Sequence, residues 1–204
     1  RLIYAQPDLS IRPGDTPYPS MYQLQNPPLI LHNHANLFSR TRVDIGTRFF
    51  LQHVPSSSGP QQIIDLGCGN GVIGLVAAHT NPQAQLSFID ESFMAIDSAQ
   101  INFKSLFGTQ RQAFFKINNG LDTIPSISAD WVLCNPPAHH LNAHDTTTAI
   151  AMFKKAKLIL KTGGSLWIIA NHKLGYQTQL KRLFGHIKCI ASNRKFVVIQ
   201  ATKT

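Results

Sequence analysis

Cysteine is scarce in this chain, with three residues among 204. Cys68, Cys134 and Cys189 lie far apart and form no C-x-x-C pair, so the sequence favours neither a disulfide framework nor a zinc ribbon. Long apolar runs are missing as well, because none approaches the ~18 residues that a membrane span needs, and no signal peptide opens the chain. We therefore expect a cytoplasmic protein without a membrane partner.

Acidic residues are the second shortage. The chain has 10 Asp and Glu against 19 Lys and Arg, which gives a net charge of +9. Such a surface attracts polyanions through long-range forces and counterion release, although a net positive charge also serves solubility alone. Nucleic acid is the leading partner class. The basic residues toward the C-terminus are either an ordinary solvated face or a contact with an RNA backbone: Lys181, Arg182, Lys188, Arg194 and Lys195.

The chain is expected to hold one sizeable domain after an extended opening segment. Half of the 12 prolines fall within residues 1–28, which show neither helical nor strand periodicity. Since the chain begins with Arg1 and not with methionine, residues 1–28 are expected to be a linker from an upstream domain. Residues 29–60 form a preamble, with a short strand at 29–32 and a helix within 43–53. Residues 61–204 form the main domain.

From residue 62 onward, strand-like and helix-like segments alternate. Strands are expected at 63–67, 86–90, near 113 and 131, at 165–170, and near 187 and 196, with helices at 72–79, 93–105, 148–160 and 177–184. This alternation is typical of an α/β fold with a mostly parallel sheet. The last two strands are too close in sequence for a crossover helix, so they should form an antiparallel hairpin.

The segment DLGCGNG follows a short apolar strand and opens a helix. It contains Asp65, Gly67, Gly69, Asn70 and Gly71. Glycines in such a turn let the backbone pass close beneath a ligand, and the amides at the helix start can hold a carboxylate. The acid at the strand end would face an ammonium group, so the loop suits the methionine part of S-adenosylmethionine.

A nicotinamide cofactor is the alternative ligand for this loop. Gly69, Gly71 and Gly74 satisfy G-x-G-x-x-G, and Asp90 at the end of the next strand is placed to accept bonds from ribose hydroxyls in either cofactor. The preceding Asp65 favours the methyl donor, because a carboxylate there would crowd a pyrophosphate.

A second motif, Asn135-Pro136-Pro137, follows a strand 66 positions after Gly69. We expect it at the mouth of the next but one parallel strand, at the same sheet edge as the glycine loop. The prolines lock the backbone and remove its donors, so the Asn135 oxygen and the carbonyls face outward as acceptors. Acceptors of this kind can accept hydrogen bonds from both protons of an exocyclic amine. The lone pair of the nitrogen is then less conjugated with the ring and can attack a methyl carbon, without a strong base.

With these motifs placed, the chain resembles the NPP-motif class I methyltransferases. It is most similar to the bacterial large-subunit rRNA guanine-N2 methyltransferase G family. The resemblance is carried by HNHANLFSRTRVDIGTRFFLQH, DLGCGNGVIGL, FIDES, INNG, VLCNPP and NRKFVVIQA. It implies a Rossmann-like class I methyltransferase fold with a seven-stranded sheet and an antiparallel C-terminal hairpin strand. It further implies methyl transfer from S-adenosylmethionine to N2 of one guanine in 23S rRNA, and an amino-terminal methyltransferase-like domain upstream.

The resemblance also assigns residues. It implies that Asp65, Gly67, Gly69 and Gly71 line the methionine part of the cofactor, Asp90 the ribose and Asn119 the adenine, with Phe38, Ser39 and Arg40 over the cofactor. Asn135 and Pro136 would hold the target amine, next to Pro137.

One position departs from the family pattern. Where the family has an aromatic residue that stacks on the target base, this chain has Ala138, followed by His139 and His140. Base stacking is worth about 1–3 kcal/mol, so one of these histidines is hypothesised to take the place of the missing ring. With His144 they could be mistaken for a metal site, but they lack a fixed ligand spacing, and no metal is expected.

Three classes of function remain open on the sequence. The first is the RNA methyltransferase, with a 16S rRNA guanine, a DNA adenine or a protein glutamine as variant targets. The second is an NAD-dependent oxidoreductase. The third is a non-catalytic RNA-binding domain that kept the methyltransferase fold.

Overall fold

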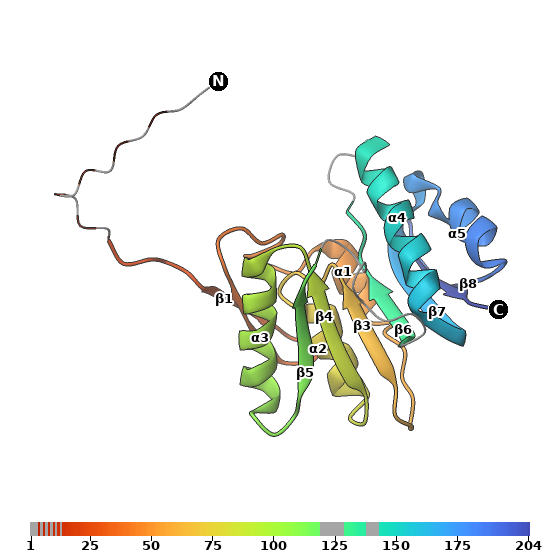
Figure 1. Ribbon diagram of the computed structural model, residues 1–204, viewed down its shortest axis with the longest axis horizontal. Coiled ribbons are helices and arrows are strands. Elements are labelled where there is room, and N and C mark those ends of the chain that lie inside the picture. Colours follow the sequence, from red (N-terminus) through yellow and green to blue (C-terminus); the bar gives the residue numbers. More distant parts are fainter. Residues whose placement is uncertain are drawn as a thin grey trace.

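In the computed structural model, a seven-stranded sheet forms the centre of the molecule (Figure 1). The structure describes residues 14–118, 129–137 and 143–204, the alternate residues 4 to 12, and no side chains for 143–145. The sheet order is β5-β4-β3-β6-β7-β9-β8. Its strands are β3 (Gln62–Leu66), β4 (Gln85–Asp90), β5 (Ala113–Ile117), β6 (Ala129–Cys134), β7 (Leu160–Asn171), β8 (His186–Ser192) and β9 (Phe196–Thr202). Strand β9 runs antiparallel to β7 and β8 and the other pairs of the sheet are parallel, which confirms the predicted fold class and C-terminal hairpin.

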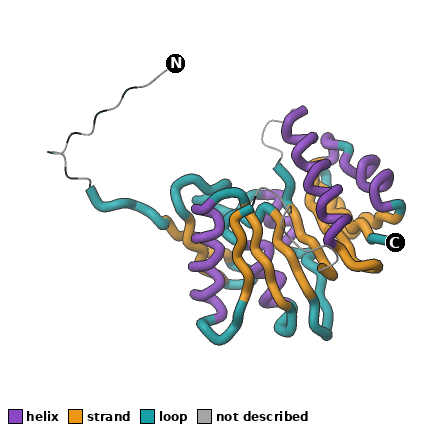
Figure 2. Tube along the Cα trace, viewed as in Figure 1, coloured by secondary structure: helices purple, strands orange, loops and turns teal. Residues whose placement is uncertain are grey.

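Helices cover both faces of this sheet (Figure 2). One face packs against α1 (Ile45–Leu51), α2 (Val72–Thr80) and α3 (Phe93–Phe107), the other against α4 (Ala143–Ile159) and α5 (Tyr176–Phe184). Successive strand residues alternate between the two cores, as Ile63 and Ile64 do, because strand side chains point to opposite faces in turn. None of the helices within the described residues is long and apolar enough to cross a bilayer.

The preamble contributes a small antiparallel hairpin of β1 (Ser20–Leu24) and β2 (Leu29–Asn33). Strand β2 confirms the prediction for 29–32, whereas the expectation that residues 1–28 carry no strand is wrong at β1. The prolines that flank β1 hide its short alternation, and the strand forms because β2 supplies hydrogen-bond partners. The hairpin packs on α3.

Helix boundaries also differ from the sequence-based prediction. Helix α1 begins at Ile45, because Asp44 caps it by accepting a bond from the Thr47 amide at 2.9 Å. Helix α4 begins at 143, earlier than the predicted 148, and β7 extends through 160–171 beyond the apolar stretch 165–170.

The order of the strands brings the two predicted motifs together. Strand β6 pairs directly with β3, with Leu66 opposite Cys134, so the expectation that it is the next but one strand is wrong. After β3 the chain builds outward through β4 and β5 and then crosses back to β6. The carboxyl ends of β3, β4 and β6 therefore meet at one edge, at the switch point where ligands bind in such sheets.

Candidate active site

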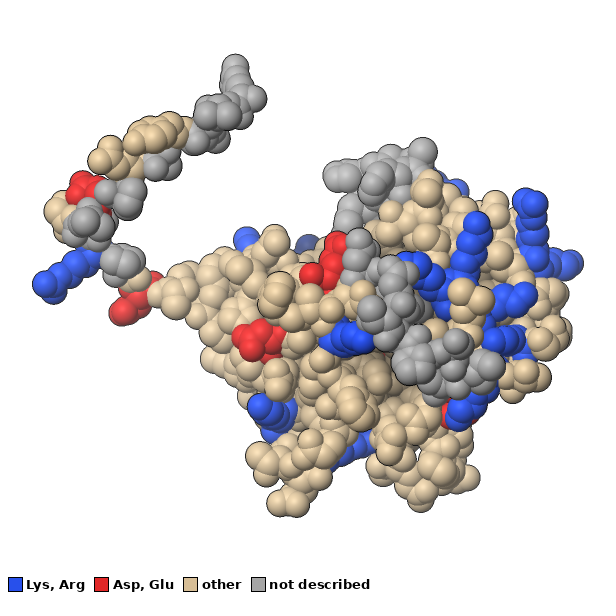
Figure 3. All heavy atoms as spheres, in the orientation of Figure 1, with Lys and Arg blue, Asp and Glu red and all other residues tan. Residues whose placement is uncertain are grey.

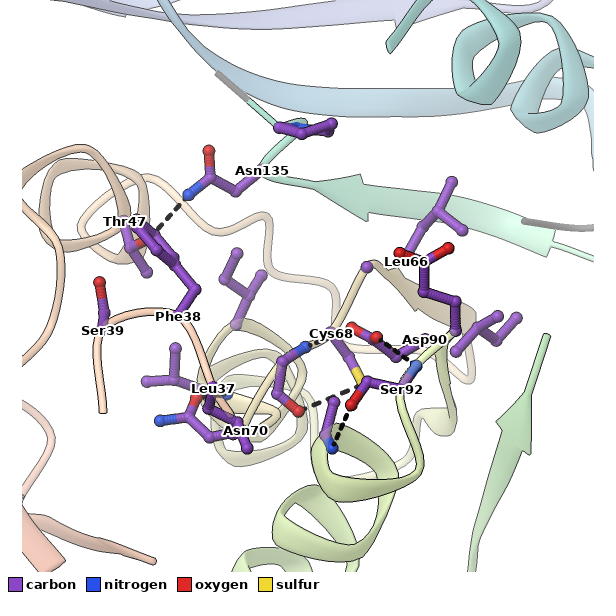
Figure 4. Close-up of a pocket in the computed structure, with 18 of the residues that line it drawn as sticks. Leu37, Phe38, Ser39, Thr47, Leu66, Cys68, Asn70, Asp90, Ser92 and Asn135 are labelled. Carbon is purple, nitrogen blue, oxygen red and sulfur yellow. Dashed lines mark hydrogen bonds between the residues drawn. The ribbon is translucent and has the colours of Figure 1, made fainter. Parts of the chain in front are cut away.

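A cavity of about 390 Å³ opens at the carboxyl ends of β3, β4 and β6 (Figure 4). This volume lies within the ~300–1,000 Å³ of small-molecule sites. The cavity brings together eight of the residues predicted from the sequence: Phe38, Ser39, Gly67, Gly69, Asn70, Asp90, Asn135 and Pro137. Its other walls come from α2, the start of α3 and one side of α4.

The glycine loop needs glycine for two different reasons. Gly67, Gly69 and Gly71 all have positive φ angles, of 69°, 54° and 82°. A Cβ on Gly71 would lie 3.0 Å from the Cβ of Ala99, so close packing against α3 excludes a side chain there. At Gly69 nothing lies within 4 Å, because the missing side chain would point into open space. Gly71 thus supports the loop from beneath, and Gly69 leaves the cavity free.

Asp65 lies beneath the loop and is not one of the described residues that line the cavity. It is fully buried, and Oδ2 accepts a bond from the Gly74 amide at 2.7 Å. Burial raises the pKa of Asp65 to about 8, the Gly74 bond opposes this rise, and the negative charge of Asp90 adds to it. Oδ1 has no hydrogen-bond partner within the described part of the chain. A cationic ligand above the loop would lower this pKa and favour the ionised carboxylate, so the unsatisfied Oδ1 fits a ligand of that charge.

Asp90 ends β4 at the rim of the cavity. Its Oδ2 accepts from the Gly69 amide and its Oδ1 from the Ser92 amide, both at 2.9 Å. A carboxylate has about four lone-pair positions, so each oxygen can accept one bond more. This geometry fits the predicted role toward a ribose diol.

Asn70 uses its side chain within the protein. Its Nδ2 donates to Tyr22 Oη at 3.0 Å and to Asn33 Oδ1 at 2.8 Å, and its Oδ1 accepts from the Val72 amide at 3.2 Å. Asn70 thereby ties the glycine loop to the hairpin of β1 and β2. The amides of Val72 and Gly74 already have partners in the protein, so the predicted carboxylate contact at the start of α2 does not come from these two groups.

Asn135 follows β6, and its side-chain amide has a defined direction. Nδ2 donates to Thr47 Oγ1 at 2.9 Å, and that hydroxyl lies 3.3 Å from Asp44 Oδ2. Figure 4 shows the Asn135 nitrogen directed at Thr47 and the oxygen directed away from it. Asn135 therefore has its oxygen available as an acceptor. Its partner Thr47 also lines the first cavity and is not among the residues predicted from the sequence.

A second cavity, of about 280 Å³, adjoins the first at Asn135. The two share Phe38, Asp44, Asn135 and Pro137. The second is also lined by Pro136, Leu174, Lys195 and Phe196. Phe196 and Asp44 are not among the site residues predicted from the sequence. An aspartate before an apolar helical pattern is a capping signal that points to Asp44, but no local pattern points to Phe196.

The remaining predicted residues do not line either cavity within the described part of the chain. Asn119, Ala138, His139 and His140 lie outside the described residues, as does the side chain of His144. Asn118, next to Asn119, does line the first cavity. Arg40, predicted over the cofactor, does not line it: its Nη1 donates to the Ala35 carbonyl at 2.5 Å, and its guanidinium lies 5.8 Å from the Tyr18 ring centre.

Two thiols lie close to the glycine loop and β6. Burial raises the pKa of both Cys68 and Cys134, so they stay protonated at neutral pH and act as small apolar side chains. Among the described residues, no group of three His, Cys, Asp or Glu side chains is arranged to hold a metal ion.

Two of the solved structures that this chain resembles are named as methyltransferases. A T. thermophilus 16S rRNA N2 methyltransferase in complex with AdoMet and guanosine superposes with a TM-score of 0.74 at 20% identity, over 90% of this chain and 50% of that one. A methyltransferase from Pyrococcus furiosus superposes with a TM-score of 0.66 at 13% identity, over 86% of this chain and 90% of that one. At these identities the likeness shows the class I methyltransferase fold.

Curated proteins with similar sequences carry the name ribosomal RNA large subunit methyltransferase G. The protein of Stutzerimonas stutzeri is 48% identical over 203 residues, and that of Streptomyces avermitilis is 44% identical over 208 residues. Each match covers 100% of this chain and 54% of the relative, so the chain spans about half the length of these proteins. The Methyltransferase small domain family matches residues 28–200. The chain therefore belongs to the Methyltransferase small domain family.

Proposed function

We propose that this chain transfers a methyl group from S-adenosylmethionine to the exocyclic N2 amine of a guanine in 23S rRNA. The observation that carries the proposal is the Asn135 amide, whose oxygen is turned outward as an acceptor at the wall shared by the two cavities. The names of the relatives support the rRNA target, and the AdoMet and guanosine in the T. thermophilus protein support the pair of ligands.

The first cavity suits the cofactor. Gly67 and Gly69 would lie under its methionine part, and Asp90 would accept bonds from its ribose hydroxyls. The carboxyl of Asp65 beneath the loop holds a proton without the ligand; the positive charge of the cofactor would lower its pKa, and the ionised carboxylate would then compensate that charge. When bound, S-adenosylmethionine would supply an electrophilic methyl group, and the electron pair of the broken C–S bond would stay on the sulfur, which becomes a neutral thioether.

The chain's own groups act on the amine. The lone pair of an exocyclic amine is conjugated into the ring, which makes it a poor nucleophile. The Asn135 oxygen and the Pro136 carbonyl would accept its two N–H bonds, which draws the nitrogen toward tetrahedral geometry and stabilises the positive charge that develops on it. The amine proton leaves after the new bond forms, so no strong base is needed.

The second cavity suits the target base. Pro136 and Pro137 form one wall, and the rings of Phe38 and Phe196 contribute to the others. Stacking of the base on one of these rings, worth about 1–3 kcal/mol, would offset the absence of a ring at Ala138. Stacking by His139 or His140 stays an alternative, and an Ala138→Phe variant tests it: unchanged turnover would support a substitute ring, whereas a gain would show that none is present.

The charge of the surface suits an RNA partner. Lys and Arg side chains gather over α4 and α5 in Figure 3, and Lys195 lines the second cavity. A polyanion would be drawn to this side and oriented with one base in the cavity. An rRNA target would place the protein in the cytoplasm.

Two measurements test the proposal. Calorimetry should detect binding of S-adenosylmethionine and none of NAD, and binding of NAD alone would contradict the methyltransferase assignment. Transfer of a labelled methyl group should then be measured on 23S rRNA, 16S rRNA, DNA and protein. Label in 23S rRNA guanine is the expected result. Label elsewhere would identify another amine or amide as the target, and no transfer to any substrate would favour a non-catalytic binding domain.

A further inference from the structure

We propose that Thr47 and Asp44 are positioning residues that fix the orientation of the Asn135 amide. The inference rests on the proposed function and names residues that serve the same site. Thr47 lies in α1 of the preamble and Asn135 in the loop after β6, 88 positions apart, yet the two side chains meet at 2.9 Å.

The direction of the relay follows from its acidic end. Asp44 Oδ2 accepts a bond from the Thr47 amide at 2.9 Å and lies 3.3 Å from the Thr47 hydroxyl. The Thr47 hydroxyl donates to Asp44 Oδ2, so the hydroxyl proton points to Asp44. The hydroxyl oxygen then has its lone pairs free for the Asn135 amide. Only the NH2 end of that amide can bind there.

This direction decides what Asn135 presents to a substrate. With Nδ2 bound to Thr47, Oδ1 is left to accept a bond from an amine proton. In the flipped orientation, the NH2 group of Asn135 would face the NH2 group of the base, donor against donor. The two ends of an amide have nearly the same shape, so packing alone cannot exclude the flipped form, and the hydrogen-bond network must do so.

The relay is also rigidly held. Thr47 is 6% exposed, so little water can replace its hydroxyl as a partner for Asn135. Asp44 caps α1, and α1 packs against α2 and β7. A Cβ on Gly46 would lie 3.0 Å from Asp44 Oδ2 and 3.1 Å from the Phe196 ring, so the absence of a side chain there leaves the carboxylate its place.

The test compares Thr47→Val, which keeps the shape and removes the hydroxyl, with Thr47→Ser, which keeps the hydroxyl. Both are measured in the full-length protein, by steady-state methyl transfer to 23S rRNA and by calorimetric binding of S-adenosylmethionine. We expect kcat of Thr47→Val to fall about 10-fold or more, with KM and cofactor affinity within about twofold of wild type. Thr47→Ser should retain most of kcat. Thr109→Val, at an exposed position outside both cavities, is the matched control.

A double-variant cycle separates positioning from stability. In an Asn135→Ala background, Thr47→Val should cause no further loss of kcat, because the amide that it orients is gone. If Thr47→Val does not fold, Thr47→Ala replaces it in the same comparison. Wild-type kcat in the hydroxyl-free variant, or an equal loss in Thr47→Ser, would overturn the relay. An inactive wild-type protein would instead overturn the proposed function.

Discussion

The backbone amide of Gly69 donates to Oδ2 of Asp90 at 2.9 Å, across a sequence separation of 21. The carboxylate that ends β4 therefore holds the glycine loop that follows β3. The two motifs that predict a cofactor form one unit, in which the acid shapes the loop and keeps lone pairs for a ligand.

Replacing Asp90 should therefore impair binding more than stability. We expect Asp90→Ala to weaken S-adenosylmethionine binding by about 10- to 100-fold, because acceptors for the ribose and the anchor of the loop are lost together. Calorimetry measures the affinity, and Asp15→Ala, at an exposed position outside the site, is the control. Unchanged affinity in Asp90→Ala would refute the assignment of the first cavity.

Asp65 should make the stability of the protein depend on pH. Its pKa is raised from 3.8 to about 8 in the folded protein, so the folded state holds a proton that the unfolded state releases. The stabilisation is complete below pH 3.8 and is lost as the pH rises to about 8. Within this window the free energy of unfolding should fall by about 1 kcal/mol per pH unit from this group.

An Asp65→Asn variant isolates that effect. It lacks the titrating carboxyl, so its denaturant unfolding curves should change less with pH than those of the wild type between pH 4 and 8. The other carboxyls titrate in both proteins and cancel in the difference. Parallel pH profiles for the two proteins would show that Asp65 has an ordinary pKa.

Gly69 and Gly71 should respond differently to alanine. Gly71→Ala is expected to destabilise the fold by about 2 kcal/mol or more, since a left-handed backbone and the 3.0 Å approach to Ala99 act together. Gly69→Ala should cost about 1 kcal/mol from the backbone alone, yet weaken cofactor binding because its methyl group enters the cavity. Thermal unfolding and calorimetry on both variants separate the two effects. Equal unfolding temperatures would contradict this division.

Replacing Phe196 should affect the RNA substrate alone, whereas replacing Phe38 should affect both the RNA and the cofactor. Phe196 lines only the second cavity, whereas Phe38 lines both. Phe196→Ala should lower kcat/KM for RNA by roughly 10-fold and leave cofactor affinity unchanged, and Phe38→Ala should affect both. Phe114→Ala, at an exposed ring on β5, is the control. Equal losses of cofactor affinity in the two site variants would count against separate cavities.

Much of the fold and part of the site could be predicted from the sequence, because they depend on short-range patterns. A strand, a glycine turn and a helix follow one another directly within residues 62–80, and each has a local signature. Asp90 and Asn135 were predicted from their places at strand ends. The C-terminal hairpin followed from the short connection near Asn193.

Other features depend on packing that no local pattern records. Whether a loop residue faces a ligand or the protein depends on which neighbours surround it: Asp65 is buried against Gly74, and Asn70 turns to Tyr22 and Asn33, although both belong to the motif that predicted the cofactor. Strand β1 exists because β2 pairs with it.

The amino-acid sequence by itself determined the chemistry available to this protein: a glycine loop with its acid, an Asn-Pro-Pro acceptor and a basic surface. Only the tertiary structure decided which way the acceptor points. The Asn135 amide is directed by Thr47, and Thr47 by Asp44, from a helix that lies far away in the sequence. Hydrogen bonds have direction, and their direction is set by partners that the fold brings together.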